Sequence, residues 1–174
     1  MYLISIYFDE QTNKQVQRYM NQVAMKSGNT FMLDGNVPPH ITISAFETRQ
    51  EEQVITHLEK LSVRMKAGTL RWVSVGMFLP YVLYIAPVLN EYLHGLSVQT
   101  YEMLSQVEDI RIRTCYQPFQ WMPHTTIGKK MTKEEIKLAT EVMQSQFGVF
   151  SGQVVKIGLS KTNPYEDIVV FDLM

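Results

Sequence analysis

Apolar residues recur along the chain with two alternating periods, one typical of strands and one typical of helices. Residues 2–8 are rich in β-branched and aromatic side chains and predict a β-strand. After Asp9, which predicts a helix N-cap, apolar side chains recur three and four residues apart as far as the Ser-Gly-Asn at 27–29. A loop over 31–38 and a second strand over 40–46 are expected to follow.

The rest of the chain continues this alternation and predicts further helices and strands. Two segments, Thr48-Arg49-Gln50-Glu51 and Thr132-Lys133-Glu134-Glu135, have the capping-box pattern that opens a helix. The expected elements are a helix from 48 to near Gly68, strands over 70–79 and 81–86 joined by a turn at Pro80, a helix capped by Asn90, an extended segment over 110–116, a strand over 124–129, a helix from 132 closed by Gly148, and strands over 154–161 and 167–173.

One short motif occurs twice. Pro39-His40-Ile41-Thr42-Ile43 returns as Pro123-His124-Thr125-Thr126-Ile127, at an offset of 124 − 40 = 84 residues. Other identities hold at the same offset: Thr48 and Thr132, Glu51 and Glu135, Gly68 and Gly152, Pro80 and Pro164, Tyr81 and Tyr165. A repeat of this kind constrains the architecture before any other argument. We expect an α+β fold with one bilobal domain over 1–174, in which units of about 39–87 and 123–174 are related by a pseudo-twofold axis. Their mainly antiparallel sheets would line a central cleft, with helices outside.

The spacing within the motif determines where its side chains point. Side chains alternate between the two faces of a strand, so a His and a Thr two residues apart share a face. The other face carries Ile41 and Ile43 in the first copy and Thr125 and Ile127 in the second. Each copy therefore presents one imidazole and one hydroxyl to the cleft, while helices cover the opposite face.

Composition limits the partners of such a protein. The net charge of −1 in 174 residues argues against capture of bulk nucleic acid, but a nucleotide or an RNA end remains compatible with it. Cys115 is the only cysteine, which excludes an intrachain disulfide and a thiolate metal cluster. The N-terminus lacks the basic region of a signal peptide, and no apolar run has the length of a membrane span. We expect a cytoplasmic monomer without membrane contact.

Two histidines on opposite sides of one centre suit phosphodiester cleavage. A neutral imidazole can take a proton from the attacking oxygen while an imidazolium donates one to the leaving oxygen. The hydroxyls of Thr42 and Thr126 can donate to the non-bridging phosphate oxygens, where charge accumulates. This chemistry requires no cofactor and no metal. A two-histidine metal site is the competing interpretation, but it lacks a convincing third ligand.

The two His-x-Thr elements, each at the start of a strand and about 80 residues apart, resemble those of the 2H phosphoesterase superfamily. Within it the chain is most similar to the bacterial and archaeal 2'-5' RNA ligase, or cyclic phosphodiesterase, group. The resemblance implies that His40 and His124 are catalytic and that Thr42 and Thr126 hold the phosphate. It also implies opening of 2',3'-cyclic phosphates on RNA ends or nucleotides, with reversible 2'-5' ligation in some members. Which histidine is the acid and which the base stays open.

Further residues are candidates for substrate contact. Some family members carry an Arg five residues after the second motif His, where this chain has Lys129. Strand alternation favours the next residue, Lys130, unless the strand ends or bulges at Gly128. Aromatic residues that could stack on a base are Phe46, Tyr81, Phe119, Trp121 and Tyr165, although core packing is the competing interpretation for each. The helical residues His57 and His94 predict partly exposed surface positions.

Two alternatives to this function remain. One is another reaction at the same site, on a cyclic phosphate of an ADP-ribose derivative or on a 2'-5' or 3'-5' linked oligonucleotide. The other is a nucleotide-binding or regulatory module that keeps the pocket without turnover. Substrate profiling distinguishes these possibilities.

Overall fold

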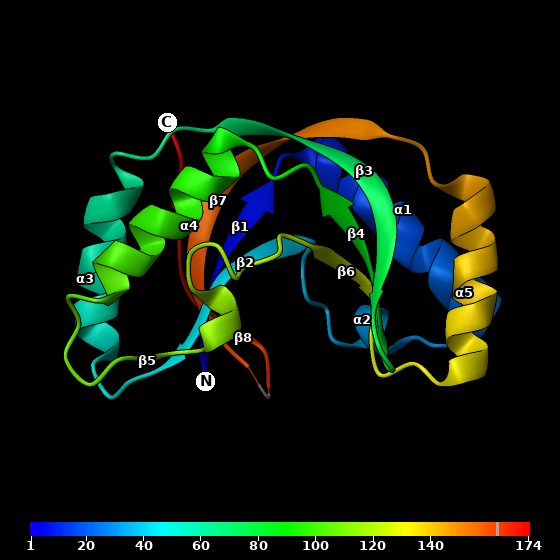
Figure 1. Cartoon of the computed structure of the whole chain (residues 1–174), viewed down its shortest axis with the longest axis horizontal. Helices are drawn as coiled ribbons and strands as arrows, with labels where there is room; N and C mark the ends of the chain where they lie inside the picture. Colours follow the sequence, from blue (N-terminus) through cyan, green and yellow to red (C-terminus); the bar gives the residue numbers. More distant parts are fainter. Residues whose placement is uncertain (163) are drawn as a thin grey trace.

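The computed structural model describes residues 1–162 and 164–174, and within them the chain folds into five α-helices, a short 3-10 helix and one eight-stranded sheet (Figure 1). In chain order the elements are β1 (Tyr2–Phe8), α1 (Glu10–Ser27), α2 (Phe31–Asp34), β2 (His40–Glu47), α3 (Glu51–Ser62), β3 (Gly68–Phe78), β4 (Val82–Pro87), α4 (Glu91–Leu104), β5 (Arg111–Ile112), the 3-10 helix η1 (Thr114–Tyr116), β6 (Thr125–Gly128), α5 (Lys133–Gln146), β7 (Phe150–Lys161) and β8 (Glu166–Asp172).

The sheet is antiparallel at every pairing of the described strands. Its order is β5-β2-β1-β7-β3-β4-β6, and β8 pairs with the C-terminal part of β7. β7 is long enough to join two groups of strands, since residues 150–154 pair with β3 and residues 154–161 pair with β1. We call β5, β2, β1 and β8 the β2 half, and β3, β4 and β6 the β6 half. The predicted α+β class is confirmed.

The register between β3 and β7 follows the 84-residue offset of the sequence repeat. Thr69 pairs with Gln153, which is 153 − 69 = 84 residues later, and the Gln153 Nε2 donates to the Thr69 Oγ1 at 2.9 Å. The flanking pairs, Gly68 with Val154 and Leu70 with Gly152, exchange when 84 is added to one number and subtracted from the other. This register is compatible with two halves related by a twofold axis at that pair, and the bilobal arrangement stays a prediction.

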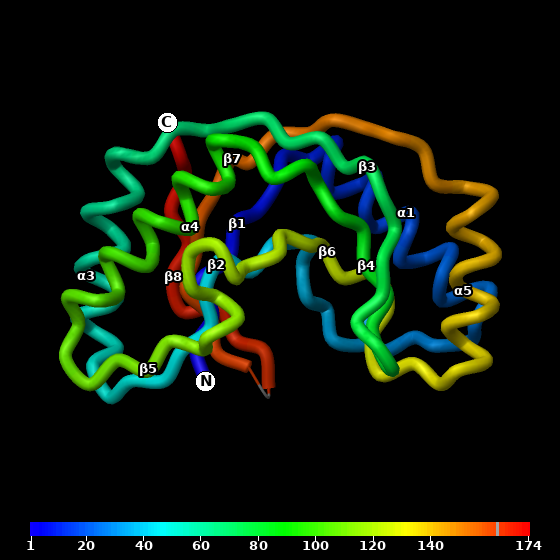
Figure 2. The backbone as a smooth tube through the Cα atoms, in the orientation of Figure 1, coloured from blue at the N-terminus to red at the C-terminus, as the bar shows by residue number. Residues whose placement is uncertain are grey.

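The helices flank the sheet in two groups, and two of them cross from one half to the other. α3 and α4 pack together on the β2 half, and α1 and α5 pack together on the β6 half (Figure 1). α1 follows β1 in the chain but lies against β6 and α5, whereas α4 follows β4 but lies against β2. Figure 2 shows this crossing in the path of the backbone. Each half therefore depends on a helix from the other.

Alternation along the motif strands places their apolar side chains in the core. Ile41, Ile43 and Ile127 have exposed fractions of 1% or less, and Thr125 is equally buried. The Trp72 Nε1 donates to the Thr125 Oγ1 at 3.2 Å, which satisfies the one polar group on that face of β6. The prediction that this face is covered is confirmed.

Three of the four predicted helix caps form. The Asp9 and Asn90 carboxyl and amide oxygens accept from the backbone N–H three residues on, at 2.7 and 2.9 Å. At α5 the full capping box is present: the Thr132 N–H donates to the Glu135 carboxylate, and the Glu135 N–H donates to the Thr132 Oγ1. α1 ends at Gly28, whose φ of 79° is in the left-handed region that glycine adopts freely.

The other predicted capping box is wrong. The Thr48 Oγ1 accepts from the Gln50 N–H, and the Glu51 carboxylate pairs with the Lys161 ammonium at 2.6 Å instead of turning back to Thr48. α3 accordingly begins at Glu51 without a side-chain cap and ends at Ser62, before Gly68. Two segments also have more structure than predicted: α2 forms inside the expected loop over 31–38, and η1 interrupts the expected extended segment over 110–116.

Candidate active site

The two motif histidines have the same local geometry. The His40 Nδ1 lies 2.8 Å from the Pro38 carbonyl oxygen, and the His124 Nδ1 lies 2.9 Å from the Met122 carbonyl oxygen. A carbonyl oxygen only accepts, so each Nδ1 must carry the proton and donate it. In each neutral ring the Nε2 is then the basic nitrogen, and neither of these contacts occupies it. The hydrogen bonds fix the tautomer and the orientation of both rings.

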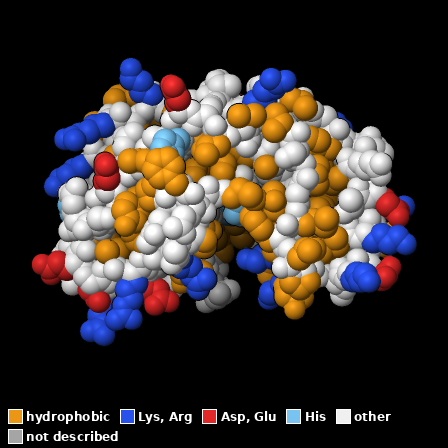
Figure 3. All heavy atoms as spheres, viewed as in Figure 1, with side chains coloured by type: hydrophobic (Ala, Val, Ile, Leu, Met, Phe, Trp, Pro, Cys, Tyr) orange, Lys and Arg blue, Asp and Glu red, His pale blue; other side chains and the backbone are white. Residues whose placement is uncertain are grey.

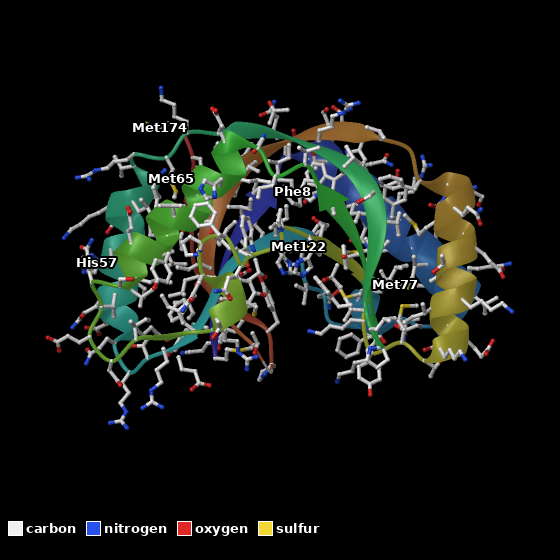
Figure 4. The ribbon with its side chains drawn as sticks, in the orientation of Figure 1. Phe8, His57, Met65, Met77, Met122 and Met174 are labelled. Atoms are coloured by element: carbon white, nitrogen blue, oxygen red, sulfur yellow. The ribbon has the colours of Figure 1, made fainter. Side chains whose placement is uncertain are left out.

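The two motif strands are held next to each other. β2 and β6 contact one another, and the Trp121 Nε1, just before the second motif, donates to the Thr42 carbonyl oxygen at 3.0 Å. Figure 4 shows Met122, whose carbonyl accepts from His124, at the centre of the molecule between the two groups of helices. The space-filling view shows the surface hollowed between the two halves, with a histidine side chain in the hollow (Figure 3).

The motif threonines differ in exposure. Thr42 is 8% exposed, and the Ser5 Oγ donates to its Oγ1 over a long 3.5 Å. Thr126 is partly exposed and pairs in register with Tyr84 of β4. Both lie two residues after a motif histidine, on the same strand face, so each hydroxyl is available beside an imidazole.

Burial lowers the pKa of both imidazoles below the ordinary value of 6.5. For His40, the lowering by burial is opposed by the hydrogen bond to Pro38, reinforced by the positive charges of His124 and Lys129, and opposed again by the carboxylate of Asp167. For His124, burial lowers the pKa and the hydrogen bond to Met122 opposes it. The effect of His124 on His40 shows that the two rings are electrostatically coupled.

The surroundings of the two histidines are different in kind. The Phe78 ring meets His124 edge to face with centroids 4.8 Å apart, and the Tyr84 ring lies 5.5 Å away. His40 instead pairs in register with Tyr7 of β1, whose ring centroid lies 6.3 Å from its own. His124 is therefore flanked by aromatic rings of the β3–β4 hairpin, and His40 by a tyrosine with polar partners.

That tyrosine belongs to a hydrogen-bonded network. The Tyr165 OH donates to the Asp167 Oδ1 at 2.6 Å, and the Tyr7 OH lies 3.2 Å from the same oxygen and 3.1 Å from the Tyr165 OH. Burial raises the pKa of Tyr7 to about 12, and burial together with Asp167 raises the pKa of Tyr165, so both keep their protons. Sequence reasoning named Tyr165 as a stacking candidate but missed Tyr7 and Asp167. Tyr7 has the same face parity in β1 as Ser5, the register partner of Thr42, but that pairing is not visible before the strands are aligned.

The two lysines after β6 point in different directions. β6 ends at Gly128, and Lys130 has a left-handed φ of 54° that carries its ammonium over the Phe31 ring, 4.5 Å from the centroid. Lys129 lies near enough to His40 to lower its pKa. The geometry thus brings Lys129 rather than Lys130 toward the motif histidines, because the strand ends before alternation reaches either residue.

The remaining candidate aromatic residues are divided between core and surface. Phe46 is fully buried and stacks on Tyr2 with centroids 5.7 Å apart, so it lies in the core and cannot stack on a ligand. Trp121 is also buried, with its indole N–H bonded to the Thr42 carbonyl. Tyr81 is 61% exposed at the β3–β4 turn, and the 89% exposed Phe119 packs on His94, with centroids 4.8 Å apart. His57 is partly exposed on the outside of α3 (Figure 4).

Two further searches concern metals and membranes. Among residues 1–162 and 164–174, no group of three or more His, Cys, Asp or Glu side chains is arranged to hold a metal ion. In the same residues, no helix combines the length and apolar character required to cross a membrane.

Comparison with known proteins agrees with the site geometry. A family model described as the 2'-5' RNA ligase superfamily matches residues 9–165. The fold is similar to that of TT0787 of Thermus thermophilus, with a TM-score of 0.60, 15% identity, and coverage of 99% of this chain and 97% of that one. It is also similar to E. coli LigT complexed with 3'-AMP, with a TM-score of 0.59, 12% identity, and coverage of 99% and 97%. No curated protein sequence matches the chain closely enough to count as a relative.

Proposed function

The chain belongs to the 2'-5' RNA ligase superfamily, and from this premise we propose that it is a phosphoesterase that opens 2',3'-cyclic phosphates of RNA ends or nucleotides by acid–base catalysis with His40 and His124. The observation that supports the proposal best is the duplicated hydrogen bond from each histidine Nδ1 to a backbone carbonyl. It leaves two Nε2 atoms, fixed in orientation, for two proton transfers at one phosphorus.

The reaction divides between the two rings. The neutral imidazole accepts a proton from a water molecule at its Nε2 as the water oxygen bonds to phosphorus. The imidazolium gives its Nε2 proton to the ribose oxygen as the bond between that oxygen and phosphorus breaks. The product is a phosphate monoester beside a free ribose hydroxyl, and the two histidines exchange their proton through solvent afterwards.

Thr42, Thr126 and Lys129 are proposed to hold the phosphate. The two hydroxyls can donate to the non-bridging oxygens, whose negative charge grows in the transition state. Lys129 supplies a positive charge at the end of β6, although an ammonium lacks the two-pronged geometry of a guanidinium. No metal is assigned a role in these steps. Reversible 2'-5' ligation would be the same proton transfers run backward, with a ribose hydroxyl in place of water.

A nucleotide as the substrate is supported by the fold neighbours. The E. coli LigT structures of the same fold are complexes with ATP, with 3'-AMP and with NADP+. Near-neutral net charge also fits a small substrate or an RNA end better than a long polyanion.

The test is hydrolysis of 2',3'-cyclic nucleotides and of an RNA with a 2',3'-cyclic end, with a chelator present and products resolved by phosphorus NMR. We expect kcat to fall by about 10²–10⁴-fold in H40A and in H124A, the range typical of lost acid–base catalysis. H57A, on the outside of α3, is the matched control and should keep parental activity. Saturable nucleotide binding without turnover would contradict the proposal and favour a binding module. Turnover only of an ADP-ribose cyclic phosphate or a linear oligonucleotide would change the substrate class.

A further inference from the structure

The duplicated motif has unequal surroundings, and the inequality concerns charge. Within the described part of the chain, Asp167 is the one carboxylate among the groups that act on the pKa of His40, and no acidic group acts on the pKa of His124. The neighbours of His124 in the structure are the Phe78 and Tyr84 rings. Proton transfer in opposite directions at the two rings requires them to differ in this way.

The carboxylate of Asp167 is held in place by two hydroxyls. Tyr165 donates to its Oδ1 at 2.6 Å, a short bond of the kind that charged acceptors form, and Tyr7 lies 3.2 Å from the same oxygen. Tyr7 is 7% exposed, so its ring is fixed by packing between His40 and the network. Asp167 itself is exposed on β8, and without these two contacts its side chain would be free to rotate into solvent.

We infer that the Tyr7–Tyr165–Asp167 network is a positioning device that holds a negative charge beside His40 and thereby makes His40 the proton donor and His124 the proton acceptor. This inference rests on the proposed function and adds to it the direction of proton transfer. The residues of the network act through His40 and are not themselves catalytic.

The other charged groups around His40 favour the same outcome once a phosphate is bound. In the free protein the positive charges of Lys129 and His124 oppose protonation of His40, while Asp167 favours it. A phosphate held by Lys129 offsets the lysine charge, and the charge of Asp167 remains. The two tyrosines stay neutral because their pKa values are raised.

The assignment fixes how the substrate lies in the cleft. The ribose oxygen that leaves phosphorus must be within reach of the His40 Nε2, so the ribose lies toward the β2 half. The attacking water must be within reach of the His124 Nε2, on the side of Phe78. Opening of the cyclic phosphate then moves one proton from His40 to the ribose oxygen and one from water to His124.

The experiment has two readouts, of which one needs no turnover. Ring signals of His40 and His124 are titrated by NMR in the parent, in D167N and in Y165F, and kcat/KM is measured against pH with a 2',3'-cyclic nucleotide. In D167N we expect the His40 midpoint to move to lower pH while that of His124 stays in place. The descending limb of kcat/KM, which reports the acid, should move with it, lowering activity above neutral pH about three- to ten-fold. Y165F should give a smaller change in the same direction.

Controls separate this inference from a general electrostatic effect and from the proposed function. D172N removes a carboxylate from the same strand, β8, where it pairs with Lys156 at 3.3 Å, and should leave both titrations unchanged. D167E should restore part of the His40 shift. An unmoved His40 midpoint in a folded D167N, or an equal shift of both histidines, would overturn the inference. So would movement of the ascending limb alone, which would make His40 the base. If no substrate is turned over, the proposed function fails, but the NMR titration still decides on the network.

Discussion

Burial at His40 and His124 determines the pH range in which the proposed reaction can run. The active form carries one proton on the pair, so kcat/KM should rise as the base loses its proton and fall as the acid loses its own. Because burial lowers both pKa values, both limbs are expected on the acid side of 6.5. A bound phosphate anion favours the imidazolium, so the profile of kcat should lie at higher pH than that of kcat/KM.

Initial rates from mildly acidic to mildly alkaline pH, at several substrate concentrations, measure these profiles. A single-limbed curve, or a kcat/KM maximum well above neutral pH, would contradict two titrating histidines with lowered pKa values.

The two motif threonines allow a matched comparison at one residue each. T126V removes a partly exposed hydroxyl of the proposed phosphate site and should lower kcat by about 10- to 1000-fold with an unchanged free energy of unfolding. T42V should lower kcat similarly, and it also leaves the Ser5 hydroxyl buried without its acceptor, at a cost of about 1 kcal/mol in stability. Steady-state kinetics and urea unfolding of both variants measure the difference. Full activity in T126V would remove that hydroxyl from the site.

At the scale of elements, strand and helix existence follows from periodicity, whereas ends depend on contacts distant in sequence. The motif strands and the helices capped by Asp9 and Asn90 are where the apolar pattern predicts them. The capping box at Thr48 is wrong because Glu51 pairs with Lys161, 110 residues later (161 − 51 = 110). In the same way, Phe46 has the pattern of a strand residue, but only the packing against Tyr2 shows that it is buried. Asp167 could not be predicted as a neighbour of His40, since β8 reaches β2 only through β7 and β1.

The two capping-box sequences give a prediction for helix ends. T132A breaks a reciprocal pair of hydrogen bonds at the start of α5 and should lower the free energy of unfolding by about 1 kcal/mol. T48A removes one hydrogen bond to Gln50 outside a helix and should cost less than half as much. Urea titrations monitored by circular dichroism compare the two variants. Equal costs would mean that the box at Thr48 forms in solution.

At the scale of the whole molecule, the two halves share one sheet and exchange helices, so we expect them to unfold together. The chain has two tryptophans that report different halves: Trp72 lies in β3, and Trp121 is bonded to the Thr42 carbonyl of β2. Single-tryptophan variants W72F and W121F should give coincident urea midpoints by fluorescence and by circular dichroism within each variant. Separate midpoints for the two probes would instead show two independent lobes and contradict a single domain over 1–174.

The exchange of α1 and α4 across the sheet has a consequence for the origin of the chain. A polypeptide of half this length could not cover its own strands, because its helix lies on the opposite half; it would need a second copy of itself. Two such copies would form a domain-swapped homodimer whose symmetry axis runs where Thr69 now pairs with Gln153. In that ancestor the two catalytic centres would be chemically identical, and neither could be specialised. Fusion into one gene allows each copy to change alone, and the aspartate and tyrosines beside one histidine and the aromatic rings beside the other are changes of that kind.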